Sequence, residues 1–422
     1  MRQYMTRFLT GDVSLLVFSG MASQVVNLAA YPFLTQSYSP ASFGVFSVIT
    51  ATATFFGAAI LMRLDTIVQI VDPDEEDDIL SAAMVVGFGL ALAGMALMLV
   101  FGEWLVGLAT EGQDWQAGYA LVVPLLALTS GLFALSRQYF AKKRRYRRLS
   151  LANFLRTLAM VAAQLGLVLL LPGPAGLIAG FGLGLGLALV LAWPVSMVVL
   201  AKVAVAPRQA LQAAWATIHR HRVYIRVDVV NVLIAASVLT FYPIIVLIGF
   251  GAEEAGIFAV ASRLVFIPID VLAASVSTVY FQRFSLAVRQ SEGMLRLFGI
   301  TLAGAAATAA AIALVVFFFA DPFVRLVFPP EWSGVSHVML LLLPTFAARF
   351  IVGCIGSTPL ALSRPKILFA WNLTQIVILG LTWIVTVNHS MDLFLLVGGI
   401  GLLGAGALYL AILWVSIRQH TA

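Results

Sequence analysis

The chain has 422 residues, of which 61% are hydrophobic and only 10% are charged, and its mean hydropathy is +1.01. This composition excludes an ordinary soluble domain and indicates a polytopic membrane protein. The net charge of +6 comes from basic residues in the connections between apolar runs, so nucleic acid is not expected as a partner. The single cysteine, Cys354, lies in an apolar run, and no disulfide is expected.

Twelve apolar runs are long enough to cross a membrane, since about 20 helical residues at about 1.5 Å each span a hydrocarbon core of about 30 Å. The first run is too long for a signal peptide and no small-residue cleavage site follows it, so we interpret it as the first span. Because backbone in lipid must satisfy its own hydrogen bonds, all spans are predicted to be helices. The predicted ranges are 13–34, 43–62, 79–100, 118–140, 151–171, 177–199, 226–248, 256–278, 295–319, 337–359, 367–387 and 392–416.

The basic residues predict the orientation of these spans. Of the 25 Lys and Arg residues, all but Arg263, Arg325 and Arg349 lie in or beside alternate connections. Cytoplasmic connections carry the excess of basic residues, so both termini are predicted to be cytoplasmic. The densest basic run, 142–148, is interpreted as a topology signal that also attracts anionic lipids at about 1 kcal/mol per charge.

A short repeat relates the two halves of the chain. Residues 43–48 (FGVFSV) and 255–260 (AGIFAV) match at half length, and a Tyr-Pro pair precedes each copy. Such a match can arise by chance in so apolar a sequence, but its position favours duplication of one unit. Six spans per half insert with the same orientation, so a repeat axis along the membrane normal is expected. We predict two six-helix bundles related by this pseudo-two-fold, at residues 1–200 and 226–422, joined by a cytoplasmic connection at 201–225.

Three other patterns have simpler interpretations than a ligand site. The acidic run 72–78 lacks the Gly and distal Glu of an EF-hand, and we interpret it as a solvated loop that favours the start of the third helix. His219 and His221 have no nearby Cys or paired carboxylates, so no metal site and no cofactor are expected. Glycines within the sixth span are interpreted as helix-packing positions rather than a nucleotide loop; they are Gly176, Gly180, Gly182, Gly184 and Gly186.

Polar residues inside the predicted spans are candidates for a functional site, because each charge at mid-membrane costs about 2.5–3.5 kcal/mol on insertion scales. Arg263 and Asp270 lie two turns apart on one helix face, with Pro268 expected to kink the helix between them. Arg349 lies near the middle of the tenth span. Two interpretations stay open: these charges line a cavity, or they only neutralise each other and bridge helices. The first span carries a polar stripe formed by Ser19, Ser23, Asn27 and Tyr31.

Two Arg-x-Asp pairs lie at the cytoplasmic ends of spans. Arg63 and Asp65 end the second span, and Arg226 and Asp228 begin the seventh. Such pairs are often interfacial anchors. Alternatively, their guanidinium groups receive an anionic lipid headgroup, since guanidinium binds phosphate through two hydrogen bonds.

The motifs together resemble a known family. Residues 39–46 (SPASFGVF), then 61–65 (LMRLD) and the acidic loop, resemble bacterial oligosaccharide flippases, the O-antigen and exopolysaccharide translocases of the multidrug, oligosaccharidyl-lipid and polysaccharide exporter superfamily. Residues 251–258 with Arg263 and Pro268 are similar to that family's seventh-to-eighth helix region. The segments at 222–224 and 329–332 agree as well. The resemblance covers nearly the whole chain, although each motif alone is degenerate.

The resemblance implies a V-shaped pair of six-helix bundles around a cationic central cleft in a bacterial inner membrane. The implied substrate is an isoprenyl-diphosphate-linked oligosaccharide, which moves to the outer leaflet by alternating access. Membrane lipids, a coupling ion and glycan-assembly proteins are further implied partners. Arg263 and Arg349 are then the expected cleft cations, and Arg63 and Arg226 are expected where the substrate enters. The full predicted site is Arg263, Arg349, Asp270, Arg63, Asp65, Arg226, Asp228 and Asn27.

The chain departs from a strongly cationic cleft, because only Arg263 and Arg349 are clearly intramembrane and Asp270 opposes them. Asp270 therefore keeps open a multidrug exporter of the same superfamily, for which acidic residues would bind cationic drugs. A lipid II flippase is a further alternative, although its members typically have two more helices. A membrane glycan polymerase or ligase would need a sizeable outside loop, which the sequence does not predict, so no enzyme activity is expected.

Overall fold

The computed structural model describes residues 12–109, 118–193, 205–290 and 292–421. Over these residues the secondary structure is helical and has no strand, as predicted for an all-α protein. The end of the sixth predicted span, the first residues of the predicted 201–225 connection and the loop after residue 109 lie outside the described residues.

The chain folds into two compact units. Unit 1 comprises Met1–Tyr38 and Val45–Pro243, and unit 2 comprises Ser39–Gly44 and Ile244–Ala422. Helices α3 and α11 therefore contribute residues to both units. The boundaries expected from the sequence, 1–200, 201–225 and 226–422, stay a prediction.

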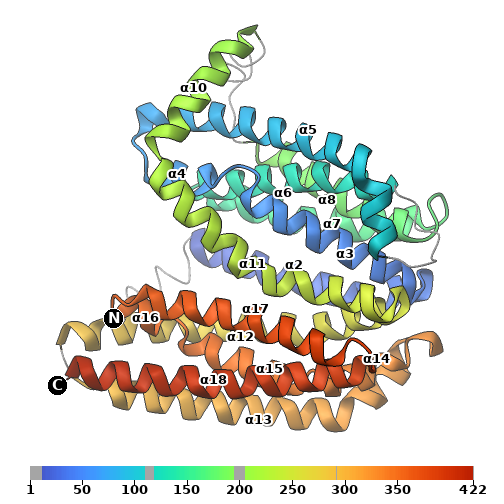
Figure 1. The fold of residues 1–422 in the computed structure, drawn as a ribbon, viewed down its shortest axis with the longest axis vertical. Coiled ribbons are helices and arrows are strands. Elements are labelled where there is room, and N and C mark those ends of the chain that lie inside the picture. Colours follow the sequence, from blue (N-terminus) through green and yellow to red (C-terminus); the bar gives the residue numbers. More distant parts are fainter. Residues whose placement is uncertain (1–11, 110–117, 194–204, 291, 422) are drawn as a thin grey trace. The chain divides into compact units, whose positions relative to one another are not determined.

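Unit 1 is built on helices that follow the predicted spans (Figure 1). α7 packs against α2 and α8, α6 packs against α4, α5 and α8, and α10 packs against α5. The elements that contribute to it are α2 (Asp12–Ser37), α3 (Pro40–Ala59), α4 (Leu64–Ile70), η1 (Pro73–Glu75), α5 (Glu76–Ala109), α6 (Gly118–Lys142), α7 (Tyr146–Leu167), α8 (Pro174–Leu191), α10 (Pro207–Arg220) and α11 (Arg222–Phe250).

Unit 2 is organised around α15, which packs against α12, α13 and α18. α17 packs in turn against α18. The elements are α12 (Ala252–Gln290), α13 (Met294–Val327), η2 (Pro330–Trp332), α14 (Gly334–Leu341), α15 (Leu343–Ile355), α16 (Thr358–Ala361), α17 (Pro365–Thr386) and α18 (Met391–Thr421). α12 continues as a helix through Pro268, and the kink expected there stays a prediction.

Ten helices in the described part of the chain are long and apolar enough to cross a membrane, and the bent helix α11 brings the number to at most eleven. The bend of 45° in α11 falls between Val238 and Thr240. Pro243 explains its position, because a proline ring clashes with the carbonyl four residues earlier. α2, which corresponds to the first predicted span, is not counted among these helices. The total of twelve spans therefore stays a prediction.

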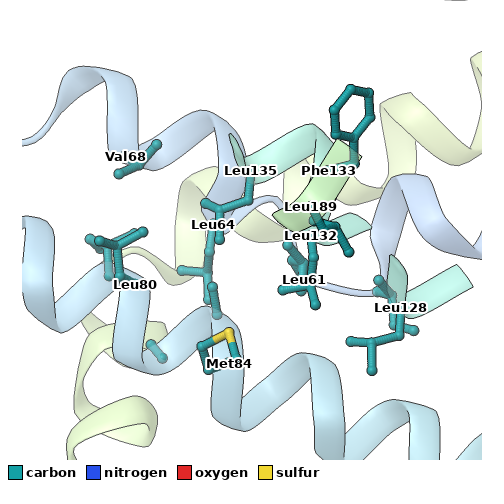
Figure 2. Packing of buried hydrophobic residues seen from close by; sticks show 14 of the residues in the cluster. Leu61, Leu64, Val68, Leu80, Met84, Leu128, Leu132, Phe133, Leu135 and Leu189 are labelled. Atoms are coloured by element: carbon teal, nitrogen blue, oxygen red, sulfur yellow. The ribbon is translucent and has the colours of Figure 1, made fainter. Parts of the chain in front are cut away.

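The core of unit 1 joins the end of α3 to α4, α5, α6 and α8. Leu61, Leu64 and Leu132 belong to one buried cluster, which also contains Leu80 and Met84 of α5 (Figure 2). All five are at most 4% exposed. This packing fixes the turn between α3 and α4, which carries one of the predicted site residues.

The glycines of α8 pack against α7 as predicted, but not all of them. A Cβ added at Gly180 would lie 2.5 Å from Gln164 Cγ, and one at Gly184 would lie 2.7 Å from the Arg156 carbonyl oxygen. At Gly186 it would meet nothing within 4 Å. The close approach of α7 and α8 therefore requires glycine at Gly180 and Gly184, whereas Gly186 has room for a side chain.

Candidate functional site

Arg63 lies in the turn between α3 and α4 and makes two ion pairs within unit 1. Its Nε donates to Asp228 Oδ2 at 2.6 Å, and its Nη1 donates to Asp65 Oδ2 at 3.3 Å. The Thr66 hydroxyl lies 3.5 Å from the same Asp228 oxygen. The side chains of Arg63, Asp65 and Asp228 are only 17%, 6% and 24% exposed. The structure thus joins three of the four charges predicted at the ends of the second and seventh spans.

The backbone that carries Arg63 is left-handed. Met62 and Arg63 have φ angles of 48° and 63°, a conformation that costs L-residues about 1–2 kcal/mol each. The flanking residues Leu61 and Leu64 are 2% and 0% exposed, so core packing holds the turn in place. The position of the guanidinium is therefore set by tertiary packing and not by local helix propensity.

The charges of this cluster do not balance, since two carboxylates share one guanidinium. Burial raises the pKa of Asp65 above its usual value, the Arg63 guanidinium acts in the opposite direction, and the Asp228 carboxylate adds to the rise. Asp65 therefore holds a proton to higher pH than an isolated aspartate. An incoming anion would have to displace a carboxylate from Arg63, because that guanidinium already has acid partners.

Glu76 forms a second cluster in unit 1 that the sequence interpretation missed. The acidic run was expected to be solvated, but the Glu76 side chain is only 7% exposed, and Lys142 Nζ and Lys143 Nζ lie 2.8 Å and 2.7 Å from its carboxylate oxygens. The cause is packing of α5 against α6, which brings the start of α5 to the end of α6. Part of the basic run 142–148 therefore has a structural role, and opposite charges in two connections that are both predicted to be cytoplasmic were the signal for it.

In unit 2, Asp270 pairs with Arg349. Arg349 Nη2 donates to Asp270 Oδ2 at 2.8 Å, and its guanidinium lies 4.8 Å from the centre of the Phe266 ring. The Arg349 side chain is 28% exposed and that of Asp270 is 52% exposed. Arg349 lies on α15, the helix that packs against α12, α13 and α18. The ion pair therefore links α12 to the central helix of its unit and keeps one side of the pair accessible.

The remaining predicted residues differ in their burial and in their place on the helices. Arg263 is half-buried on α12, Arg226 is exposed at the start of α11, and Asn27 is half-buried on α2. Ser23, in the same polar stripe as Asn27, is buried and its hydroxyl donates to the Ser19 carbonyl at 2.7 Å. The roles predicted for these residues stay predictions.

No cluster of three or more His, Cys, Asp or Glu residues that could hold a metal ion occurs among the described residues. His219, which was considered as a ligand, lies 3.2 Å from Arg222 Nη1 instead. The chemistry that the described clusters offer is therefore that of guanidinium, ammonium and carboxylate groups.

Many apolar helices with ion pairs between them define the chain as a multi-pass membrane protein. A family profile described as polysaccharide biosynthesis protein matches residues 34–337, and the chain belongs to this family. Among curated protein sequences, none matches the chain.

Solved structures share the fold over nearly the whole chain. The lipid II flippase MurJ in an inward closed conformation has a TM-score of 0.72 and 16% identity, over 94% of this chain and 87% of that protein. An inward-facing multidrug resistance MATE family transporter of the MOP superfamily has a TM-score of 0.66 and 14% identity, over 94% and 95% of the two chains. A Vibrio cholerae MATE transporter has a TM-score of 0.55 and 16% identity, over 99% and 97%. The chain thus shares its fold with MurJ and with these MATE transporters.

Proposed function

We propose that the protein flips an isoprenyl-diphosphate-linked oligosaccharide from the cytoplasmic to the outer leaflet of a bacterial inner membrane. The observation that carries this proposal is the polysaccharide biosynthesis family match over residues 34–337. That range includes Arg63, Asp228 and Asp270 and ends just before Arg349. The fold shared with MurJ, which is named a lipid II flippase, supports movement of a lipid-linked substrate.

The physical problem of this substrate explains why charged groups lie on apolar helices. A diphosphate and its sugars cannot cross about 30 Å of hydrocarbon without polar partners, whereas an isoprenyl chain is apolar and dissolves in the hydrocarbon core. Guanidinium groups bind phosphate oxygens through two parallel hydrogen bonds. Arg63 at the cytoplasmic end and Arg349 on α15 are the cations that we assign to this task.

Before the substrate binds, each of these cations is paired with a carboxylate. Arg63 pairs with Asp65 and Asp228, and Arg349 pairs with Asp270. A diphosphate that replaces a carboxylate frees that carboxylate, and the free energy of this exchange can bias one conformation over another. We assign transport by alternating access to such exchanges, with both termini in the cytoplasm, and no enzyme activity is part of the proposal.

A second candidate is lipid II export, which the TM-score of 0.72 with MurJ favours. Both lipids present a diphosphate and an isoprenyl chain, so the same arginines would serve either substrate. The sugar and peptide parts differ, and a transport assay that uses each lipid in turn separates the two functions.

The proposal is tested in cells that carry only a variant of this gene. Arg263→Ala, Arg349→Ala and Arg63→Ala are each expected to abolish the surface glycan and to accumulate the lipid-linked precursor at the inner leaflet, with normal protein in the membrane. Arg144→Ala, at an exposed position of the basic run, is the control and should export normally. Normal surface glycan in all three variants would contradict the proposal. The proposal would also be contradicted if the gene restored drug resistance to the cells but not glycan export.

A further inference from the structure

α10 is an amphipathic helix in the connection that follows α8. Its apolar residues Leu211, Ala214, Trp215 and Ile218 fall at the spacing of one helix face, and Arg208, Gln212 and His219 lie along one edge of that face. α10 packs against α5 and runs at an angle across the start of that helix (Figure 1). A helix of this kind lies in the membrane interface with its apolar face toward the acyl region.

α10 leaves much of its apolar face uncovered. Ala214 is 2% exposed and Ile218 packs against the core of unit 1, but Trp215 is 70% exposed and Leu211 is 61% exposed. Arg220 Nη1 lies 2.6 Å from Glu75 Oε1, which fixes the end of α10 beside the start of α5. The exposed side chains therefore form one wall of a groove whose other wall is α5.

This groove has a volume of 590 Å³ and is lined almost entirely by apolar groups. Its size lies within the range of about 300–1,000 Å³ that is usual for small-molecule sites. α5 contributes Val85, Val86, Gly89 and Leu90 to the lining, and Met62 lines the groove as well. A Cβ added at Gly89 would meet nothing within 4 Å, so the groove is open at this residue.

Through Met62, the groove adjoins a charged cluster. Met62 precedes Arg63, whose guanidinium is held by Asp65 and Asp228. The basic side chain of Arg222 and the hydroxyl of Tyr224, 3.4 Å from the Thr66 hydroxyl, follow α10 in the chain. An apolar groove that leads to guanidinium groups complements a molecule with a hydrocarbon chain and a phosphate head.

We propose that the groove between α5 and α10 holds the isoprenyl chain of the transported lipid while its diphosphate lies at Arg63. This inference rests on the proposed function and adds a binding site for the tail. The groove opens toward lipid, since the apolar stretch of α5 is largely uncovered within the protein. The isoprenyl chain can therefore enter the groove sideways from the inner leaflet without leaving the hydrocarbon core. Unit 1 would thus bind both the diphosphate and the isoprenyl chain of the lipid.

Photolabelling of the full-length protein in proteoliposomes tests the site. The probe is farnesyl diphosphate that carries a benzophenone on its terminal isoprene. We expect labelled peptides from α5 and α10, and at least a tenfold loss of label in Gly89→Trp, which fills the groove, and in Trp215→Ala, which removes its wall. Gly304→Trp is the matched control, because Gly304 is an exposed helical glycine of α13 with nothing within 4 Å. Equal thermal stability of the three variants excludes misfolding as the cause.

Competition identifies the occupant. Unlabelled farnesyl diphosphate should remove the label, whereas excess phosphatidylglycerol or inorganic diphosphate should leave it in place. Label elsewhere in the chain, label unaffected by both groove variants, or displacement by phosphatidylglycerol would overturn the proposal. Transport of the oligosaccharide lipid by wild-type protein is measured in parallel. Intact transport with no label in the groove contradicts the tail site alone, whereas a labelled groove without transport contradicts the proposed function.

Discussion

Gly44 at the start of α3 and Gly256 at the start of α12 lie against each other within unit 2. A Cβ at Gly44 would overlap the carbonyl oxygen of Ala252, and a Cβ at Gly256 would overlap the carbonyl oxygen of Pro40. The two contacts are reciprocal, because Gly44 and Gly256, like Pro40 and Ala252, are separated by the same 212 residues as the 43–48 and 255–260 repeat. The crossing requires glycine on both helices.

Replacing either glycine should separate these helix ends. Gly44→Ala and Gly256→Ala are expected to destabilise the folded protein by about 1–3 kcal/mol, the usual cost of an overfilled contact, and to reduce transport at least tenfold. Gly299→Ala is the control: its Cβ would meet nothing within 4 Å, and alanine is the better helix former by about 1 kcal/mol. Thermal unfolding in detergent measures both effects. Equal melting temperatures for Gly44→Ala and wild type would show that the crossing is not needed.

The Arg349–Asp270 pair should do more than join two helices. Arg349→Asp combined with Asp270→Arg restores an ion pair with the guanidinium on α12 instead of α15. We expect the double variant to recover the stability that either single change loses, but to remain at least tenfold slower in transport, because the phosphate-binding group has moved. Melting temperature and export are measured on the same preparations. Export restored together with stability would reduce the pair to a structural role.

Asp65 should make stability depend on pH. Its pKa is raised in the folded protein, so between the unfolded value near 3.8 and the higher folded value the folded state binds more protons. Stability is then greatest below this window and falls as pH rises through it. Asp65→Asn should flatten the decrease, and Asp74→Asn, at an exposed site, should leave it as in wild type. A melting temperature of Asp65→Asn with the wild-type pH profile would contradict this assignment.

The Glu76 cluster should contribute to folding of unit 1. Lys142→Met with Lys143→Met leaves a buried carboxylate without partners, and breaking a buried pair in this way costs about 3–5 kcal/mol. Because Lys143 is 36% exposed, we expect the lower end of that range. Adding Glu76→Met should recover most of the loss, whereas Arg144→Met with Arg147→Met, at exposed positions, should change little. Guanidinium chloride or thermal unfolding measures the difference, and an unchanged lysine double variant would contradict a structural role.

The sequence predicts the helices well, because a run of apolar residues in lipid has few alternatives to helix. Each predicted range overlaps an observed helix or, at 337–359, a series of short ones. The predicted ends are less accurate: α12 extends to Gln290, because polar residues continue the helix beyond the apolar run. Helix existence is thus readable from composition, while helix ends depend on packing.

The candidate site was predictable as a set of residue types but not as pairs. Asp270 was considered together with Arg263 on its own helix, and its contact with Arg349, 79 residues away, depends on how α12 and α15 pack. Similarly, the left-handed turn at Arg63 has no glycine to signal it and results from burial of Leu61 and Leu64. Contacts between distant segments are set by tertiary packing, which one sequence does not specify.

Transport by purified protein is the sharpest test of the proposed flippase function. Fluorescent isoprenyl-diphosphate oligosaccharide is placed in the inner leaflet of proteoliposomes, and its appearance outside is followed by quenching with a membrane-impermeant reagent. We expect wild-type protein to accelerate transfer, Arg63→Ala and Arg349→Ala to abolish this acceleration, and Arg144→Ala to behave as wild type. Transfer at the rate of protein-free liposomes, or equal rates for wild type and both arginine variants, would contradict that function.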